Sequence, residues 1–192
     1  MTGKNSTNKP LKRFCFTGVR GVGKSTIIDR IKSNVPEVHF VSGSGILQEM
    51  MGDDYIFFEY LPEKEKYSLR IKLNELLRNT QLLVARDLVV DSHLTVYNLK
   101  TDFIDTIFTE QDIEFYTDII LLDSCPEKIY NHRSKDTSKK RILDMGNIAR
   151  ELETEREEAK RVASEYGLGL YIIEMDNSAD EEMKKLLCSD RE

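Results

Sequence analysis

The sequence contains few of the residues that mark special architectures. Its 192 residues include only 3 Cys, 4 Pro and 10 Gly, too few for a disulfide-dense or collagen-like chain. The longest uninterrupted apolar runs have four residues, as at Ile119–Leu122, and this excludes an apolar helix able to cross a bilayer. Positive charge is also scarce, because 28 Lys and Arg oppose 34 Asp and Glu to give a net charge of −6. An acidic balance argues against broad binding to duplex nucleic acid.

The residues that are present fit one cytoplasmic globular domain. Hydrophobic residues make up 40% of the chain, enough for a core in a protein of this length. Cys15, Cys125 and Cys188 lie far apart and lack the Cys-x-x-Cys spacing, so we expect reduced thiols in a cytoplasmic protein. The first residues are rich in Lys, Asn, Ser and Thr and lack the apolar stretch of a signal peptide. We expect residues 1–11 to be a disordered leader and residues 12–192 to be a single domain.

Five short apolar runs alternate along the chain with helical patterns. They are Arg13–Thr17, Val38–Val41, Leu88–Asp91, Ile119–Asp123 and Leu170–Ile173. Apolar residues follow one another in these runs rather than alternating with polar ones, as expected of parallel strands covered on both faces. Strands that alternate with helices predict right-handed crossovers and a three-layer α/β/α sandwich.

Three of the intervening segments have clear helical signals. Pro62 stands at a favoured first position of a helix, and the leucines that follow it share one face: Leu69, Leu73, Leu76 and Leu77. Pro126 can open a second helix that runs toward Arg133. Ile148–Tyr166 has an apolar stripe, and we expect its many charges to lie on the opposite, outer side. Gly167 then supplies a helix stop.

A glycine-rich motif follows the first expected strand. Residues 18–25 have the spacing Gly-x-x-x-x-Gly-Lys-Ser, the P-loop pattern, in the strand–loop–helix context that it requires. Glycines let backbone N–H groups turn inward around an anion, and the following helix adds its positive N-terminal dipole. We expect Lys24 to contact the β- and γ-phosphates of ATP and the Ser25 hydroxyl to bind Mg²⁺. The expected nucleotide-binding residues are Gly18, Gly21, Val22, Gly23, Lys24, Ser25 and Thr26.

Polar side chains at two strand ends are further candidates. Asp91 ends the Leu88–Asp91 strand, where a carboxylate beside a P-loop can hold Mg²⁺ directly or through water; an ordinary turn-capping aspartate is the alternative. Asp123 ends the next strand, which we expect to lie farther from the phosphates, so capping is preferred there. His93 follows Asp91 by two residues and can line the substrate cleft or satisfy a turn hydrogen bond.

A local cluster of positive charge interrupts the acidic sequence. Five of the nine residues in 133–141 are basic. Because the cluster follows the fourth strand and its helix, we favour a lid over about 133–145 that closes on the P-loop and excludes water. A solvated loop and a nucleic-acid patch are the alternatives. The second ranks last, because no aromatic residues are interleaved with the charges.

Taken together, these segments resemble the archaeal-type adenylate kinases. Gly21–Thr26 is similar to that family's phosphate loop, Leu88–Thr95 resembles its Val-Val-Asp-Thr-His-Ser-Thr segment, and Asp136–Arg141 resembles its lid. The resemblance extends over about Phe14–Asn177. It implies a P-loop NTPase fold with a five-stranded parallel sheet and a short lid, Mg·ATP as the phosphoryl donor, and a nucleoside monophosphate or similar small acceptor.

The resemblance also implies roles for individual residues. Arg133, Lys139 and Arg141 would act with Lys24 on the transferring phosphoryl group. Gly43 and Ser44 would lie at the mouth of the acceptor site, with His93 nearby. Phosphotransfer from ATP is therefore our leading functional hypothesis.

Departures from the family pattern keep a second hypothesis open. Glu59 lies where the family has a basic residue and would repel an acceptor phosphate, and residues 98–108 lack the family's Pro-Gly run. Lys139 also replaces an arginine and so lacks its bidentate fork. An ATP-binding regulator or slow ATPase without an acceptor site is therefore the alternative. A GTPase switch fits poorly, since the chain lacks an Asn-Lys-x-Asp motif. The sequence leaves the oligomeric state open.

Overall fold

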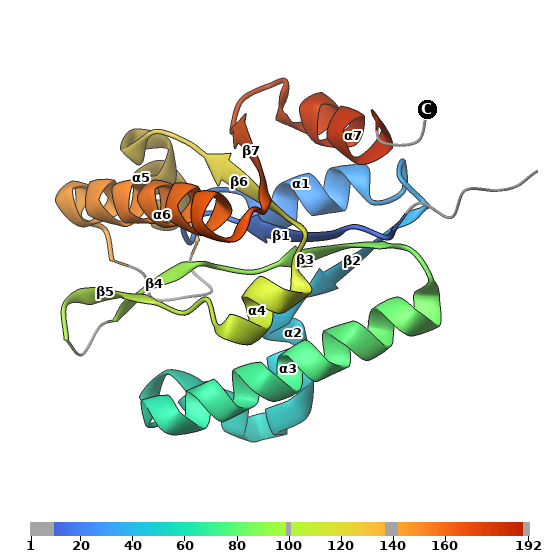
Figure 1. Cartoon of the computed structure of the whole chain (residues 1–192). Coiled ribbons are helices and arrows are strands. Elements are labelled where there is room, and N and C mark those ends of the chain that lie inside the picture. Colours follow the sequence, from blue (N-terminus) through green and yellow to red (C-terminus); the bar gives the residue numbers. More distant parts are fainter. Residues whose placement is uncertain (1–9, 99–100, 137–141, 190–192) are drawn as a thin grey trace, which may run out of the picture.

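A five-stranded parallel sheet forms the centre of the molecule (Figure 1). The computed structural model describes residues 10–98, 101–136 and 142–189. The strands are β1 (Arg13–Thr17), β2 (Val38–Ser42), β3 (Asp87–Asp91), β6 (Asp118–Asp123) and β7 (Gly169–Glu174). They run in the order β2-β3-β1-β6-β7, and every neighbouring pair is parallel. The five expected strands and the α/β/α fold class are thus confirmed.

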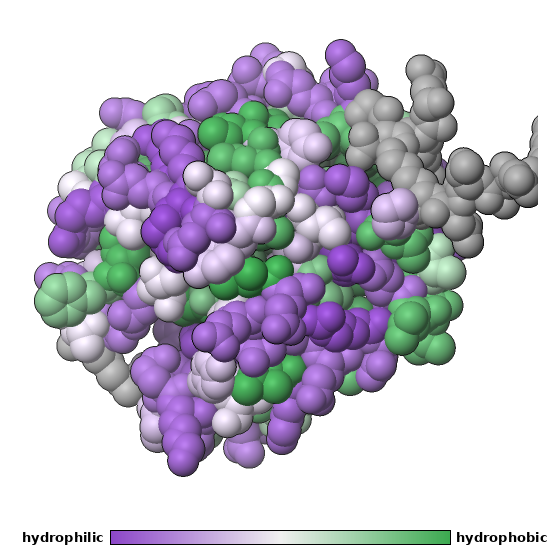
Figure 2. Space-filling model, viewed as in Figure 1, coloured by the Kyte–Doolittle hydropathy of each residue, from purple (hydrophilic) through white to green (hydrophobic). Residues whose placement is uncertain are grey.

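Helices cover both faces of this sheet, which explains why its strands are continuously apolar. Alternate residues of β1 point to opposite faces: Phe14 and Phe16 enter one core cluster and Cys15 enters the other. The first cluster packs against α1 (Lys24–Ile31) and α7 (Ala179–Ser189), and the second against α3 (Glu63–Val84). On the face shown in Figure 2, hydrophilic residues predominate and hydrophobic ones form small separate patches.

The strand order decides which loops meet at the carboxyl edge of the sheet. β1 lies between β3 and β6, with Phe16 opposite Asp91 on one side and Ile120 on the other. The expectation that β6 lies farther from the P-loop is therefore wrong, because β6 adjoins β1 as directly as β3 does. Asp123 nevertheless has a local structural role. Its carboxylate accepts a hydrogen bond from Ser124 N at 2.8 Å and forms an ion pair with Arg156 at 2.7 Å.

Several elements between β2 and β6 were not expected from the sequence. α2 (Gly43–Met51) leads into a 3₁₀ segment, η1 (Gly52–Tyr60), which precedes α3. After β3 the chain forms an antiparallel hairpin, β4 (Thr95–Asn98) and β5 (Phe103–Thr106), which packs against α6 (Met145–Tyr166). α4 (Glu110–Phe115) then begins with a capping box between Thr109 and Asp112.

The long helix α6 (Met145–Tyr166) begins with a cap from Asp144 and stops at Gly167, which adopts a left-handed conformation. Its charges do not all lie on the outer side as expected, because Glu151, Glu155 and Glu158 are buried. Over the three described stretches, no helix has the length and apolar character needed to cross a membrane.

Both ends of the segment expected to form a lid, about 133–145, lie in helices. Residues 133–135 are the last residues of α5 (Pro126–Lys135), and Met145 is the first residue of α6. Lys139 and Arg141 lie outside the described residues.

The leucines of α3 allow a matched test of the packing. Leu77 is 1% exposed in the second core cluster, whereas Leu83, on the same helix, is 87% exposed. We expect Leu77→Ala to lower the free energy of unfolding by about 2–5 kcal/mol through a lost contact and a cavity. Leu83→Ala should change it by less than about 0.5 kcal/mol. Urea unfolding of both variants measures the difference, and equal losses would contradict this arrangement of α3.

Candidate functional site

The loop between β1 and α1 has a backbone that only glycine suits. Gly18, Gly21 and Gly23 have φ angles of +142°, +86° and +116°, which side-chain-bearing residues rarely adopt. At Gly18 and Gly21 there is also no room for a side chain, because a Cβ atom would lie 2.5 Å from Leu122 O and 2.9 Å from Arg133 Cγ. At Gly23 it would lie 2.7 Å from Cε of Met175, the end of a flexible side chain. The loop is therefore packed directly against β6, α5 and the segment after β7.

Backbone amides at the start of α1 form the anion-binding part of this loop. The first bond of the helical series runs from Ile27 N to Gly23 O at 3.1 Å, so the amides of Lys24, Ser25 and Thr26 precede it and have no acceptor within the helix. Ser25 and Thr26 are exposed. Free amides at the positive end of a helix are suited to bind phosphate. Val22 differs, because its side chain is 1% exposed and belongs to the core.

Lys24 is the buried cation of the loop. Its side chain is 6% exposed, and Nζ donates a hydrogen bond to Gly18 O at 2.8 Å. Nζ lies 3.7 Å from Asp91 Oδ1 and 3.5 Å from His93 Nδ1. Burial lowers the pKa of Lys24, although Asp91 and Glu155 oppose this shift. Residues from two separate sequence segments thus meet at one point.

A magnesium ion would find suitable ligands here. The Ser25 hydroxyl and the Asp91 carboxylate are the oxygen ligands that this hard cation prefers, and Mg²⁺ usually keeps several waters and takes few protein ligands. Among the described residues no cluster of three or more His, Cys, Asp or Glu could hold a metal by itself. Ser25 is exposed at the start of α1, beside amides that are suited to bind phosphate, and phosphate oxygens would complete such a site.

Arg133 has a different setting from the one expected for a lid cation. It lies in α5, is 5% exposed, and forms a bidentate ion pair with Glu151 at 2.9 and 2.8 Å. Its Nε also donates to Arg20 O at 2.9 Å. The guanidinium therefore supports the P-loop from behind, and its donors are occupied by protein acceptors.

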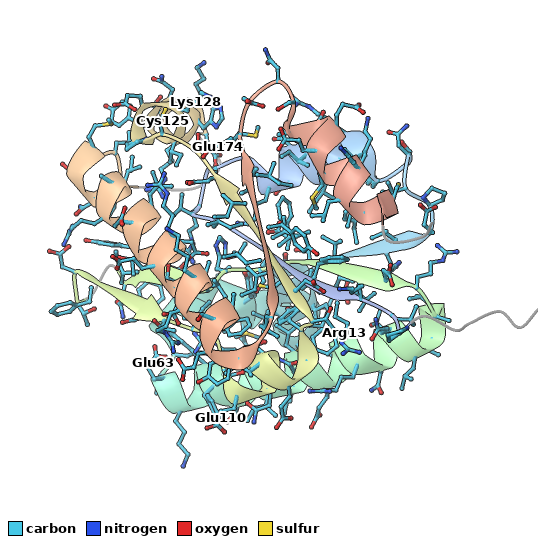
Figure 3. The ribbon with its side chains drawn as sticks, turned by 45° about the horizontal axis from the view of Figure 1, so that its top comes forward. Arg13, Glu63, Glu110, Cys125, Lys128 and Glu174 are labelled. Atoms are coloured by element: carbon cyan, nitrogen blue, oxygen red, sulfur yellow. The ribbon has the colours of Figure 1, made fainter. Side chains whose placement is uncertain are left out.

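The end of β7 closes the loop from another side. Met175 follows β7, and its side chain lies over Gly23. Lys128 of α5 donates from Nζ to Met175 O at 3.0 Å, and Figure 3 shows Cys125 and Lys128 close to Glu174 at the end of β7. This contact joins α5 to β7 around the P-loop.

The start of α2 lies next to Asp91. A Cβ on Gly43 would lie 3.2 Å from Asp91 O, and Ser42 caps the helix by accepting a hydrogen bond from Gly45 N at 3.1 Å. Gly43 and Ser44, expected at the acceptor mouth, therefore adjoin the strand end that carries Asp91.

Sequence reasoning missed two charged residues at the site. Arg20 of the P-loop pairs with Glu59 of η1 at 2.9 Å, and both side chains are partly exposed. The motif leaves position 20 unspecified, so no pattern marked it. Glu155 is buried behind the P-loop and could have been suspected because it shares one helical face with Ile148 and Leu152.

The buried Arg133–Glu151 pair gives a direct test of P-loop support. We expect Arg133→Met to lower the free energy of unfolding by about 3–5 kcal/mol, because it leaves the Glu151 carboxylate buried without its partner. The double variant Arg133→Met/Glu151→Met should be more stable than Arg133→Met alone. Urea unfolding measures all three proteins, and a double variant less stable than the single one would contradict this interpretation.

Solved structures share this fold over nearly the whole chain. The shikimate kinase from Acinetobacter baumannii, solved with shikimate, is 16% identical with a TM-score of 0.57, and the match covers 94% of this chain and 95% of that one. The shikimate kinase from Bacteroides thetaiotaomicron is 17% identical with a TM-score of 0.50, covering 93% and 99%. A sugar kinase from Janibacter sp. is 12% identical with a TM-score of 0.56, covering 93% of each chain.

Identity this low establishes the likeness of fold alone. Among curated proteins, none matches this sequence. The family described as AAA domain matches residues 17–150, a range that begins at the last residue of β1 and includes the P-loop, Asp91, Arg133 and most of the chain. The protein therefore belongs to the AAA domain family.

Proposed function

We propose that this protein is a Mg·ATP-dependent phosphotransferase that passes the γ-phosphoryl group to a small acceptor. The observation that carries the proposal is the setting of Lys24. Its ammonium group donates to Gly18 O of the glycine-rich loop at 2.8 Å and lies 3.7 Å from the Asp91 carboxylate. The Lys24 ammonium group, the amides at the start of α1 and the Asp91 carboxylate lie close together, and this combination fits the phosphates and the magnesium ion of Mg·ATP. The fold shared with proteins named shikimate kinase and sugar kinase supports the same reaction class.

The chain's own groups account for most of the expected chemistry. Lys24 would leave Gly18 O and donate to the β- and γ-phosphate oxygens, and the amides of Ser25 and Thr26 would bind the same phosphates. These donors are fixed before the reaction, so they stabilise the charge that develops on the transferring group. Mg²⁺, when bound at Ser25 and Asp91, would neutralise further phosphate charge. Lys139 and Arg141 are proposed as additional clamps on the strength of the family resemblance.

For the acceptor we propose a nucleoside monophosphate, as the resemblance to archaeal-type adenylate kinases implies. Glu59 no longer argues strongly against this, because its charge is paired with Arg20 at 2.9 Å. Arg20 itself offers a cation between the P-loop and η1 for an incoming phosphate. Gly43 and Ser44, beside Asp91, and His93 would line the same side.

A hydroxyl-bearing small molecule is the second candidate acceptor. The structures with the same fold over 93–94% of this chain include kinases named for shikimate and for a sugar. Because a nucleoside monophosphate and a hydroxy acid differ in charge and size, a single acceptor panel separates the two candidates.

The proposal predicts that the protein forms ADP from Mg·ATP in the presence of an acceptor, and that this activity requires Lys24. We expect ADP formation from Mg·ATP to rise when one member of a panel of mononucleotides, shikimate and simple sugars is added. Lys24→Ala should lower this rate by at least about 10²–10³-fold, as removal of a fixed transition-state donor does. Lys32→Ala is the matched control, since Lys32 lies at the end of the same helix and pairs with exposed Asp29.

Two results would overturn the proposal. Full activity of Lys24→Ala would remove the mechanism. If no acceptor raised ATP consumption above hydrolysis, transfer would be disproved for that panel, and the ATP-binding regulator or slow ATPase would become the better description.

The Arg20–Glu59 pair gives a test of the acceptor side. Glu59→Gln removes a competitor for Arg20 worth about 0.2–1 kcal/mol, so we expect the KM for a mononucleotide acceptor to fall by up to about fivefold. The KM for Mg·ATP should stay unchanged. Asp53→Asn, also in η1, controls for the change in net charge. Equal effects of both variants would show that Arg20 does not contact the acceptor.

A further inference from the structure

A buried carboxylate from α6 joins the two segments that carry the candidate site. Glu155 is 1% exposed. Its Oε1 accepts hydrogen bonds from Leu94 N at 3.2 Å and from the Thr17 hydroxyl. Its Oε2 accepts from Thr95 N at 2.9 Å and from the Thr95 hydroxyl. Four donors thus surround this carboxylate, and two of them are backbone amides.

The partners of Glu155 flank the functional residues on both segments. Thr17 is the last residue of β1 and directly precedes Gly18. Leu94 and Thr95 directly follow His93, whose Nδ1 lies 2.9 Å from Gly18 O. A further hydrogen bond, from Leu94 N to the Thr17 hydroxyl at 3.1 Å, links the two segments directly. The P-loop and the segment after Asp91 therefore share one anchor.

We propose that Glu155 is the positioning residue of this site: it fixes the P-loop and the 92–95 segment relative to each other. The effect on nucleotide binding rests on the proposed function. The effect on the two segments does not, because it follows from the hydrogen bonds themselves.

Glutamine is an informative replacement because it keeps the size of the side chain and changes its chemistry. Its amide NH₂ group would face donors where a carboxylate oxygen now accepts. The threonine hydroxyls can rotate to adapt, but a backbone N–H cannot. Either Thr95 N loses its acceptor, or Leu94 N keeps the Thr17 hydroxyl as its one remaining partner in this group.

The experiment compares Mg·ATP binding in three proteins. Calorimetry with a non-hydrolysable ATP analogue and Mg²⁺ is carried out at pH 7 on the wild type, Glu155→Gln and Glu158→Gln. Glu158 is the matched control: it is buried on the same helix and pairs with Arg161 of that helix. We expect Glu155→Gln to weaken binding by about tenfold at pH 7, with Glu158→Gln close to wild type.

A stability measurement distinguishes positioning from a general loss of folding. Urea unfolding of the same three proteins shows whether each variant is folded under the conditions of the binding experiment. Weaker binding by a folded Glu155→Gln protein is the expected result, and wild-type affinity of this folded variant would overturn the proposal.

Two further measurements cover the remaining outcomes. If Glu155→Gln does not fold, Glu155→Asp keeps the carboxylate but shortens its reach, and we expect weaker binding; wild-type affinity would overturn the proposal. Amide hydrogen exchange without ligand tests the anchor by itself: exchange at Leu94 and Thr95 should accelerate in the Glu155 variant. If the wild type binds no nucleotide, the proposed function fails while this exchange still decides the anchoring role, and unchanged exchange would reject it.

Discussion

The close approach of the P-loop backbone to its neighbours is the constraint on which the site depends. At Gly18 and Gly21 even a methyl group would collide with β6 or α5. This contact is possible because β1 is central, so that its carboxyl end is flanked by two strands rather than one. The loop is thereby held in shape before any ligand arrives, and the ordering cost of binding is reduced.

Buried charge surrounds this loop, and it brings specificity rather than stability. Lys24, Arg133, Glu151 and Glu155 are all removed from water, and such desolvation costs several kcal/mol per ion. Each is compensated by a partner or by several hydrogen bonds, so each tolerates only one local arrangement. The resulting rigidity suits a site that must stabilise charge on a transferred group.

Most of the sheet could be predicted from the sequence, because continuous apolar runs such as Ile119–Leu122 leave few alternatives to buried parallel strands. The P-loop could also be predicted, since its spacing reflects local backbone requirements. The order of the strands could not, and the position of β6 was therefore misjudged. Contacts between residues far apart in sequence were equally inaccessible: Arg20 with Glu59, and Glu155 with Thr17 and Thr95, depend on how the elements pack.

The spacing of two buried carboxylates on α6 restricts the insertions and deletions that this helix can tolerate. Glu151 and Glu155 are one turn apart on the same side of a single rigid helix, and they hold Arg133 on one flank of the P-loop and the β1–β4 junction on the other. Inserting or deleting one residue before Glu151 would rotate both carboxylates by about 100° and remove both supports together. We therefore expect the protein not to tolerate insertions or deletions in the first turns of α6, even though it tolerates single substitutions on the solvent-facing side of this helix.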